Sequence, residues 1–178
     1  SLITDGAAAV LLASEERAKS ISKKPVWIAG LALGTDTMRI TERESLTSIM
    51  AAREAAKVAY KMAGIGPADI DVATVHDCFT IAEIVAYEDL GFCEKGEGGK
   101  FIEAKETYVD GKIPVNVDGG LKSKGHPLGA TGVSMAIEIT KQLRGEAGER
   151  QVKNAAIGLS HNVGGTGQVV AIHIFRRE

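Results

Sequence analysis

The 178-residue sequence has few cysteines and no long apolar run. Its two cysteines, Cys78 and Cys93, are too few for a disulfide framework and suit a reducing compartment, and their spacing matches no zinc ribbon. No apolar stretch approaches the roughly 18 residues that a membrane-spanning helix needs, and no charged, then apolar, then small-residue leader opens the chain. We therefore expect a cytoplasmic protein with no membrane partner.

The sequence also lacks a basic patch, an internal repeat and a low-complexity segment. The formal net charge is −2 and the lysines and arginines are scattered, which argues against a nucleic-acid partner. A composition of 44% hydrophobic and 25% charged residues is ordinary for a globular domain. Because the chain starts at Ser1 without a methionine and runs directly into an apolar segment, we expect it to be part of a longer polypeptide.

What is present is an alternation of strand-like and helix-like segments. Apolar runs predict five strands, over residues 7–13, 26–33, 70–75, 155–160 and 168–175, with a short extended piece at 114–117. Amphipathic patterns with caps or glycine stops predict helices over 14–19, 45–63, 79–90 and 133–143. The glycine-rich, charged stretch 91–111 is predicted to be an exposed excursion or lid. This order predicts an α/β domain in which helices cover a mixed five-stranded sheet.

The most informative stretch is the octapeptide Gly125-His126-Pro127-Leu128-Gly129-Ala130-Thr131-Gly132. Pro127 restricts His126 to extended geometry, and the glycines allow another backbone or a ligand to come close. The loop leads into the predicted helix 133–143, whose macrodipole disfavours an imidazolium and so favours the neutral form that a general base needs. The alternative is a histidine that only caps a loop.

Three predicted loops carry residues suited to one site. His76-Asp77-Cys78 follows a strand and precedes a helix, His126 precedes a helix, and His161 ends a strand. Such loops commonly gather at one edge of an α/β sheet, and a helix N-terminus and a neighbouring histidine favour the thiolate of Cys78. Taken alone, Cys78 also fits a small buried apolar group, and His76 and His161 also fit ordinary hydrogen-bonding groups.

Other candidates are weaker. We interpret His173 as a structural residue of the last strand and Cys93 as a loop cysteine without a catalytic role. The turn Gly164-Gly165-Thr166-Gly167 matches no phosphate-binding loop, but its exposed backbone N–H groups suit an oxyanion hole.

Together these residues resemble the C-terminal half of a thiolase. The match rests on the Gly125 to Gly132 octapeptide, on His76-Asp77-Cys78-Phe79 upstream and on the glycine-rich turn before the last strand, and it runs in the right order over essentially the whole chain. Most thiolases carry Asn-Glu-Ala-Phe and Cys-x-Gly where this chain has His76-Asp77-Cys78-Phe79 and His161-Asn162-Val163-Gly164. Both departures resemble the sterol-carrier-protein-type thiolases and their archaeal relatives. The decarboxylating condensing enzymes share the two-half architecture, but the octapeptide favours a thiolase.

The resemblance implies half of a layered αβαβα fold, with residues 1–24 as the tail of the N-terminal half and 25–178 as the C-terminal domain. It implies acyl transfer between coenzyme A thioesters, by Claisen condensation or thiolytic cleavage, without a bound cofactor or metal. His126 would activate the nucleophilic cysteine, Cys78 would shuttle the α-proton and His76 would help to hold an oxyanion. The resemblance also assigns oxyanion and substrate contacts to His161, Val163, Gly164, Gly165, Gly125 and Pro127.

The nucleophile itself is not in this chain, because the family's cysteine belongs to the N-terminal half. The implied partners are that half, acyl-CoA and CoA, a second copy in a homodimer or tetramer, and a small acyl-CoA-binding protein. Two alternatives remain open. One is a non-catalytic thiolase-like scaffold or acyl-CoA-binding subunit, and the other is a metal site made by His76, Cys78, His126 and His161.

Overall fold

The computed structural model describes all 178 residues and contains one four-stranded mixed sheet. The strands are β1 (Val26–Thr35), β2 (Val72–Val75), β3 (Ile157–Gly164) and β4 (Val169–Arg177), arranged in the order β1-β4-β3-β2. The β3–β4 and β4–β1 pairs are antiparallel, whereas β2 runs parallel to β3. The predicted α/β class with a mixed sheet is therefore confirmed.

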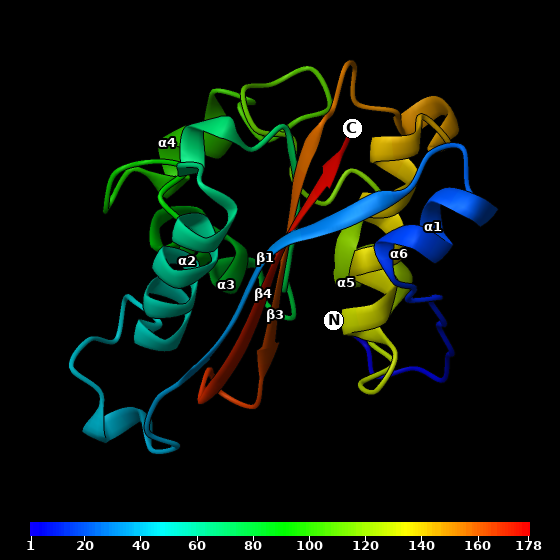
Figure 1. The fold of residues 1–178 in the computed structure, drawn as a ribbon. Coiled ribbons are helices and arrows are strands. Elements are labelled where there is room, and N and C mark those ends of the chain that lie inside the picture. Colours follow the sequence, from blue (N-terminus) through cyan, green and yellow to red (C-terminus); the bar gives the residue numbers. More distant parts are fainter.

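Helices cover both faces of this sheet (Figure 1). On one face lie α2 (Met50–Ala63), α3 (Thr80–Asp89) and α4 (Gly98–Glu103), and on the other α1 (Glu15–Ile21), α5 (Gly120–Lys124) and α6 (Thr131–Arg144). Short 3-10 helices span Ile40–Glu42, Pro67–Asp69 and Gly148–Arg150. No helix is both long and apolar enough to cross a membrane.

The two helix layers pack against the sheet in different ways. The alanine-rich face of α2 lies against β1 and β4, and a side chain at Gly30 or Gly34 of β1 would collide with the backbone of α2. This close approach lets the larger core cluster form between α2, α3 and the sheet. A smaller cluster around Ile139 fills the space between α6 and the opposite face.

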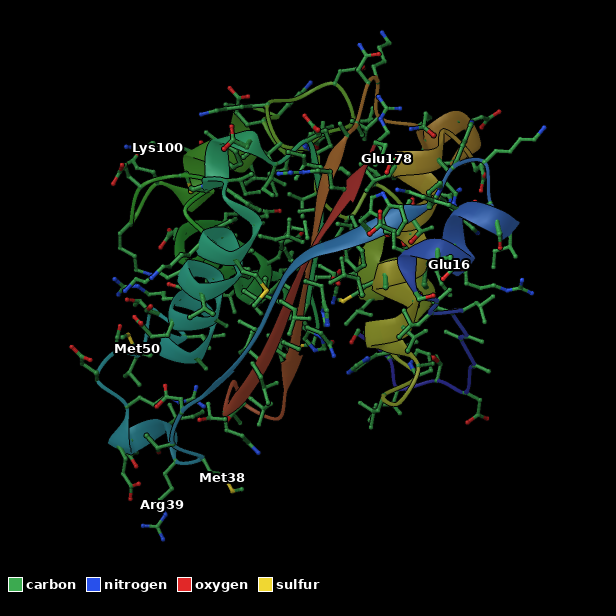
Figure 2. All side chains as sticks on the ribbon, in the orientation of Figure 1. Glu16, Met38, Arg39, Met50, Lys100 and Glu178 are labelled. Carbon is green, nitrogen blue, oxygen red and sulfur yellow. The ribbon has the colours of Figure 1, made fainter.

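Most predicted elements are found with small shifts in their ends. Ser14 caps α1 by accepting a hydrogen bond from the backbone N of Arg17 at 3.4 Å. Helix α2 ends at Gly64, which adopts the left-handed φ of 68° that glycine allows. Figure 2 places Met38 and Arg39 in the connection between β1 and α2, away from the sheet.

One of the five predicted strands, the one over residues 7–13, is wrong. Residues 7–13 form no strand, because no sheet edge lies beside them to pair with their backbone, and Leu11 and Leu12 are 82% and 74% exposed. Beside β2 the sheet is extended only by a single parallel bridge from Val115 to Ala73.

The predicted lid is wrong as well. Residues 91–111 contain α4, and Phe92 and Phe101 from this stretch are buried in the larger core cluster. Burial of the two phenyl rings stabilises this segment against the core by more free energy than the ordering of its glycines and charged residues costs.

Candidate active site

The site lies where β2 ends beside the middle of β3. Val75 of β2 pairs with His161 of β3, so His76 leaves the sheet next to Asn162. The Nδ1 atom of His76 lies 3.1 Å from Oδ1 of Asn162. The parallel register of two strands thus fixes the starting point of the loop that carries His76, Asp77 and Cys78.

The structure brings His76 and His126 together. Their rings meet edge to face, with centroids 4.9 Å apart and an interplanar angle of 80°. His76 is only 4% exposed, and burial lowers its pKa, as does the neighbouring His126 ring. Burial also lowers the pKa of His126, which supports the predicted neutral form. Both rings are therefore neutral near pH 7.

The proton on His126 can be placed from its hydrogen bonds. Nδ1 of His126 lies 2.7 Å from Oγ1 of Thr131, and that hydroxyl donates its only hydrogen to the carbonyl of Pro127 at 3.2 Å. In this arrangement the hydroxyl accepts from Nδ1–H of His126. This leaves the lone pair on Nε2, the atom that would take a proton from a thiol.

The first residues of the chain hold the histidine loop. The backbone N of His126 donates to the carbonyl of Leu2 at 2.8 Å, and the backbone N of Thr4 donates to the carbonyl of His126 at 3.4 Å. Gly125 has a φ of 83°, and a Cβ there would lie 2.5 Å from Cγ2 of Thr4. Gly125 and Pro127 therefore set the backbone of the loop.

Cys78 lies on the same loop as His76, and its side chain is partly exposed. The expectation of a favoured thiolate is wrong, because burial raises the pKa of Cys78 more than the neighbouring backbone N–H groups lower it. Helix α3 begins only at Thr80, so its N-terminus does not compensate for burial. Cys78 is thus a thiol at rest, which suits a proton donor.

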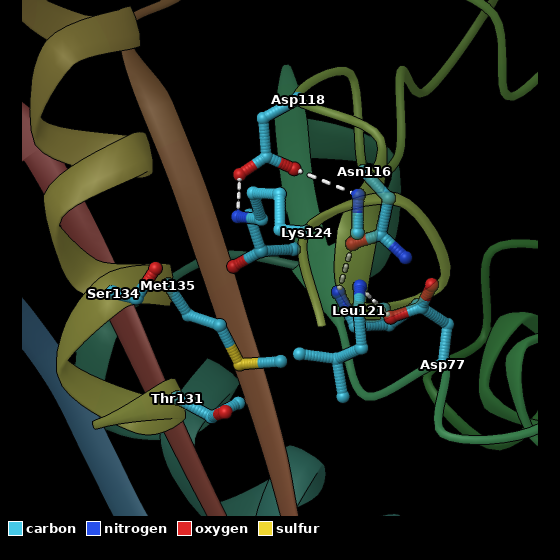
Figure 3. Close-up of a pocket in the computed structure, with 11 residues that line it drawn as sticks. Asp77, Asn116, Asp118, Leu121, Lys124, Thr131, Ser134 and Met135 are labelled. Carbon is cyan, nitrogen blue, oxygen red and sulfur yellow. Dashed lines mark hydrogen bonds and ion pairs between the residues drawn. The ribbon is translucent and has the colours of Figure 1, made fainter. Parts of the chain in front are cut away.

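Asp77, which lies between His76 and Cys78 in the sequence, is 2% exposed, and its side chain contacts α5. Its carboxylate accepts a hydrogen bond from the backbone N of Leu121 at 2.8 Å (Figure 3). It accepts a second one from the backbone N of Lys122 at 3.1 Å. A Cβ at Gly120, whose φ is 60°, would collide with this carboxylate. The contact ties the loop of Cys78 to α5, five residues before His126.

The remaining predicted residues of the β3 region lie within the strand or in the turn that follows it. His161 is inside β3 rather than at its end, is 1% exposed, and has no hydrogen-bond partner on either ring nitrogen. Val163 and Gly164 continue β3, and Gly165 with its φ of 60° starts the turn. That turn packs on the connection after β1, where Arg43 donates to the carbonyl of Thr166 at 2.6 Å. No group of three or more potential metal ligands is assembled, so the metal alternative gains no support.

Sequence reasoning missed the polar residues that support the site. The side chains of Asn162 and Asn116 bind His76 and the residue before it. Asp77 and Thr131 lie in the two loops themselves, and their side chains fix those loops by binding Leu121 and His126. Strand alternation was the available signal for Asn162, because it places neighbours of His161 on the opposite face of β3. The others depend on contacts between distant segments.

A family model described as Thiolase C-terminal domain-like matches residues 32–177. An acetyl-CoA acetyltransferase of Methanothermobacter thermautotrophicus is 52% identical over 177 residues, 99% of this chain and 46% of the relative. Sterol carrier protein 2 of Bos taurus is 44% identical over 94% of this chain and 32% of the relative.

Among solved structures, the Ltp2-ChsH2(DUF35) aldolase superposes with a TM-score of 0.82 at 26% identity, covering 91% of this chain and 42% of that one. The chain spans less than half the length of these relatives. This chain belongs to the thiolase family, as a thiolase C-terminal domain.

Proposed function

We propose that this chain is the C-terminal part of a thiolase that transfers acyl groups between coenzyme A thioesters, as an acetyl-CoA acetyltransferase or a 3-ketoacyl-CoA thiolase. The observation that carries the proposal is the convergence of His76 and His126 at 4.9 Å, with Cys78 on the loop of His76. The nucleophilic cysteine would come from an N-terminal half that ends in residues 1–24. This assignment would place residues 25–178 as the C-terminal domain.

In the cleavage direction, His126 accepts the proton of the nucleophilic thiol at Nε2, and the sulfur bonds to C3 of a 3-oxoacyl-CoA. The C2–C3 bond then breaks, and its electron pair remains on C2. Cys78, a thiol at rest, donates its proton to C2 and releases acetyl-CoA. CoA then gives its thiol proton to the Cys78 thiolate and takes the acyl group from the enzyme thioester, and the released nucleophilic thiolate recovers its proton from His126. Condensation is the reverse sequence.

The two histidines would also stabilise the oxyanions. His76 donates its Nδ1–H to Oδ1 of Asn162, so Nε2 of the neutral ring carries a lone pair and would act on a thioester oxygen through a bridging water that donates a hydrogen to each. His161 and the backbone from Val163 to Gly165 are proposed to shape the second oxyanion site, with Gly125 and Pro127 placing the His126 loop. The substrates are coenzyme A thioesters, and no cofactor is required.

The experiment compares the complete polypeptide, with an N-terminal half joined to Ser1, with this chain alone. We expect thiolytic cleavage of acetoacetyl-CoA only by the complete polypeptide, and activity of the 178 residues alone would contradict the proposal. His126→Ala and Cys78→Ser should each lower kcat by about 10²- to 10⁴-fold. Cys93→Ser is the matched control, since Cys93 packs against the larger core cluster and should leave the rate unchanged.

An unchanged rate in His126→Ala would instead favour the scaffold or acyl-CoA-binding subunit.

Partner association is part of the proposal. The similar structure is that of an aldolase with a DUF35 partner, which supports a small acyl-CoA-binding partner for this chain beside a homodimer or tetramer. Size measurement of the complete polypeptide, alone and with such a protein, tests both.

A further inference from the structure

Asn116 occupies a strained backbone position beside the candidate site. Its φ of 49° is in the left-handed region, which few residues other than glycine adopt. Its backbone N donates to the carbonyl of Ala73 at 3.0 Å, and its own carbonyl accepts from Gly119 N at 2.8 Å. The strained conformation is therefore fixed at the edge of β2, and strain of this kind is often kept at functional sites.

The side chain of Asn116 binds both ends of the loop that carries His76 and Cys78. Its Oδ1 accepts from the backbone N of Val75 at 2.9 Å, and its Nδ2 donates to Oε1 of Glu83 at 3.0 Å. Val75 directly precedes His76, and Glu83 lies in the first turn of α3. One amide group thus spans the loop, and its orientation is fixed, because only the oxygen can accept and only the nitrogen can donate.

The chain that follows Asn116 leads directly to His126. Between them, the N-terminus of α5 binds the carboxylate of Asp77, so the segment contacts the 76–78 loop a second time. Figure 3 shows Asn116 and Leu121 close to Asp77 around one small cavity. A single segment of ten residues after Asn116 therefore carries one histidine and holds the loop of the other.

We propose that Asn116 is a positioning residue for thiolase chemistry, with Glu83 as its partner. Its amide holds the His76–Cys78 loop at the spacing from His126 that the two proton transfers require. This inference rests on the proposed function for its catalytic consequence. Asn116 contacts no reacting atom itself and acts through the loop.

Glu83 makes the proposal testable by charge. Burial raises the pKa of Glu83, while the Tyr87 hydroxyl and the Asn116 amide donate to its carboxylate, and Asp77 adds a repulsive charge. Asn116→Asp keeps the shape of the side chain but turns a carboxylate oxygen toward Glu83. The two carboxyl groups then need a shared proton, as close carboxylate pairs do. Adding Glu83→Gln reverses the bond, because the new amide at position 83 donates to the new carboxylate at 116.

The experiment measures kcat, KM and pH profiles in the complete polypeptide. Asn116→Gly keeps the left-handed backbone and removes the side chain, and we expect kcat to fall about 10- to 100-fold with KM within about twofold. The kcat of Asn116→Asp should fall by a similar factor at pH 7, and it should recover relative to the kcat of the native enzyme as the pH is lowered. The double variant N116D/E83Q should return to within about threefold of the native kcat and lose that pH dependence.

Asn154→Gly is the matched control. Asn154 has a similar φ of 59° in the loop before β3, and its only recorded hydrogen bond is through its backbone carbonyl. The Asn154→Gly substitution should leave kcat unchanged. A double variant as slow as Asn116→Asp alone, or an Asn116→Gly enzyme with native kcat, would overturn the proposal.

Histidine titration by NMR in the complete polypeptide separates this proposal from the proposed function. In Asn116→Gly the loosened loop should let His76 approach water, so its pKa should move up toward the ordinary value of about 6.5, and N116D/E83Q should restore the native value. If the complete native polypeptide shows no turnover, the proposed function fails, and the titration alone then decides the positioning role. An unmoved His76 pKa in Asn116→Gly contradicts that role.

Discussion

The buried ring of His161 makes stability depend on pH in a way that can be calculated. Burial lowers its pKa from 6.5 to about 3, so between these values the unfolded chain binds a proton there and the folded chain does not. Stability from this group is complete above pH 6.5 and is lost as the pH falls toward 3. The slope is about 1.4 kcal/mol per pH unit, and acidification from pH 6.5 to 5 should cost about 2 kcal/mol.

Replacing His161 by leucine isolates this contribution. Because neither ring nitrogen has a hydrogen-bond partner, an apolar side chain leaves no orphaned group, and stability at pH 7 should be unchanged or higher. Urea unfolding between pH 7 and pH 5 measures the slope. The native chain should lose about 2 kcal/mol more than His161→Leu over this range. Equal slopes in the two proteins would refute a neutral buried imidazole at His161. His173→Leu, which replaces the half-buried histidine of β4, is the control.

Three further changes probe packing, charge and the tautomer. Gly34→Ala places a Cβ against the backbone of α2 and should lower the free energy of unfolding by about 2 kcal/mol in urea titration. Arg150→Met leaves the carboxylate of Glu138, 5% exposed, without its bidentate partner, and calorimetry should show a loss of about 3 kcal/mol. Thr131→Val removes the acceptor for Nδ1–H of His126 and should lower kcat at least 10-fold in the complete polypeptide, while Thr131→Ser should not.

The sequence allowed the local elements to be predicted because their signals are local. The Ser14 cap, the Gly64 stop and the strand at residues 72–75 each depend on neighbours in the chain, and each is found, although all four residues of the strand are buried rather than alternating. The gathering of His76 and His126 at one sheet edge was also predictable, since parallel strands share an edge.

The features that were predicted wrongly or missed share a physical cause, because each of them depends on groups that are distant in the sequence. Whether residues 7–13 form a strand depends on a partner edge, which composition does not encode. The pKa of Cys78 depends on burial by segments far from the helix that follows it. Asn116 resembles an ordinary turn residue until the carboxylate of Glu83 and the backbone of Val75 are placed against it.

The unpaired apolar run at residues 7–13 has a consequence for the behaviour of the chain in solution. Its seven residues contain no charge, proline or glycine, and their backbone N–H and C=O groups are free to pair with another copy. Segments with these properties nucleate intermolecular β-structure. We expect the isolated chain to aggregate with rising concentration, detectably by light scattering, and Leu11→Lys to slow this. The same seven residues therefore determine how long the isolated domain remains usable in a test tube.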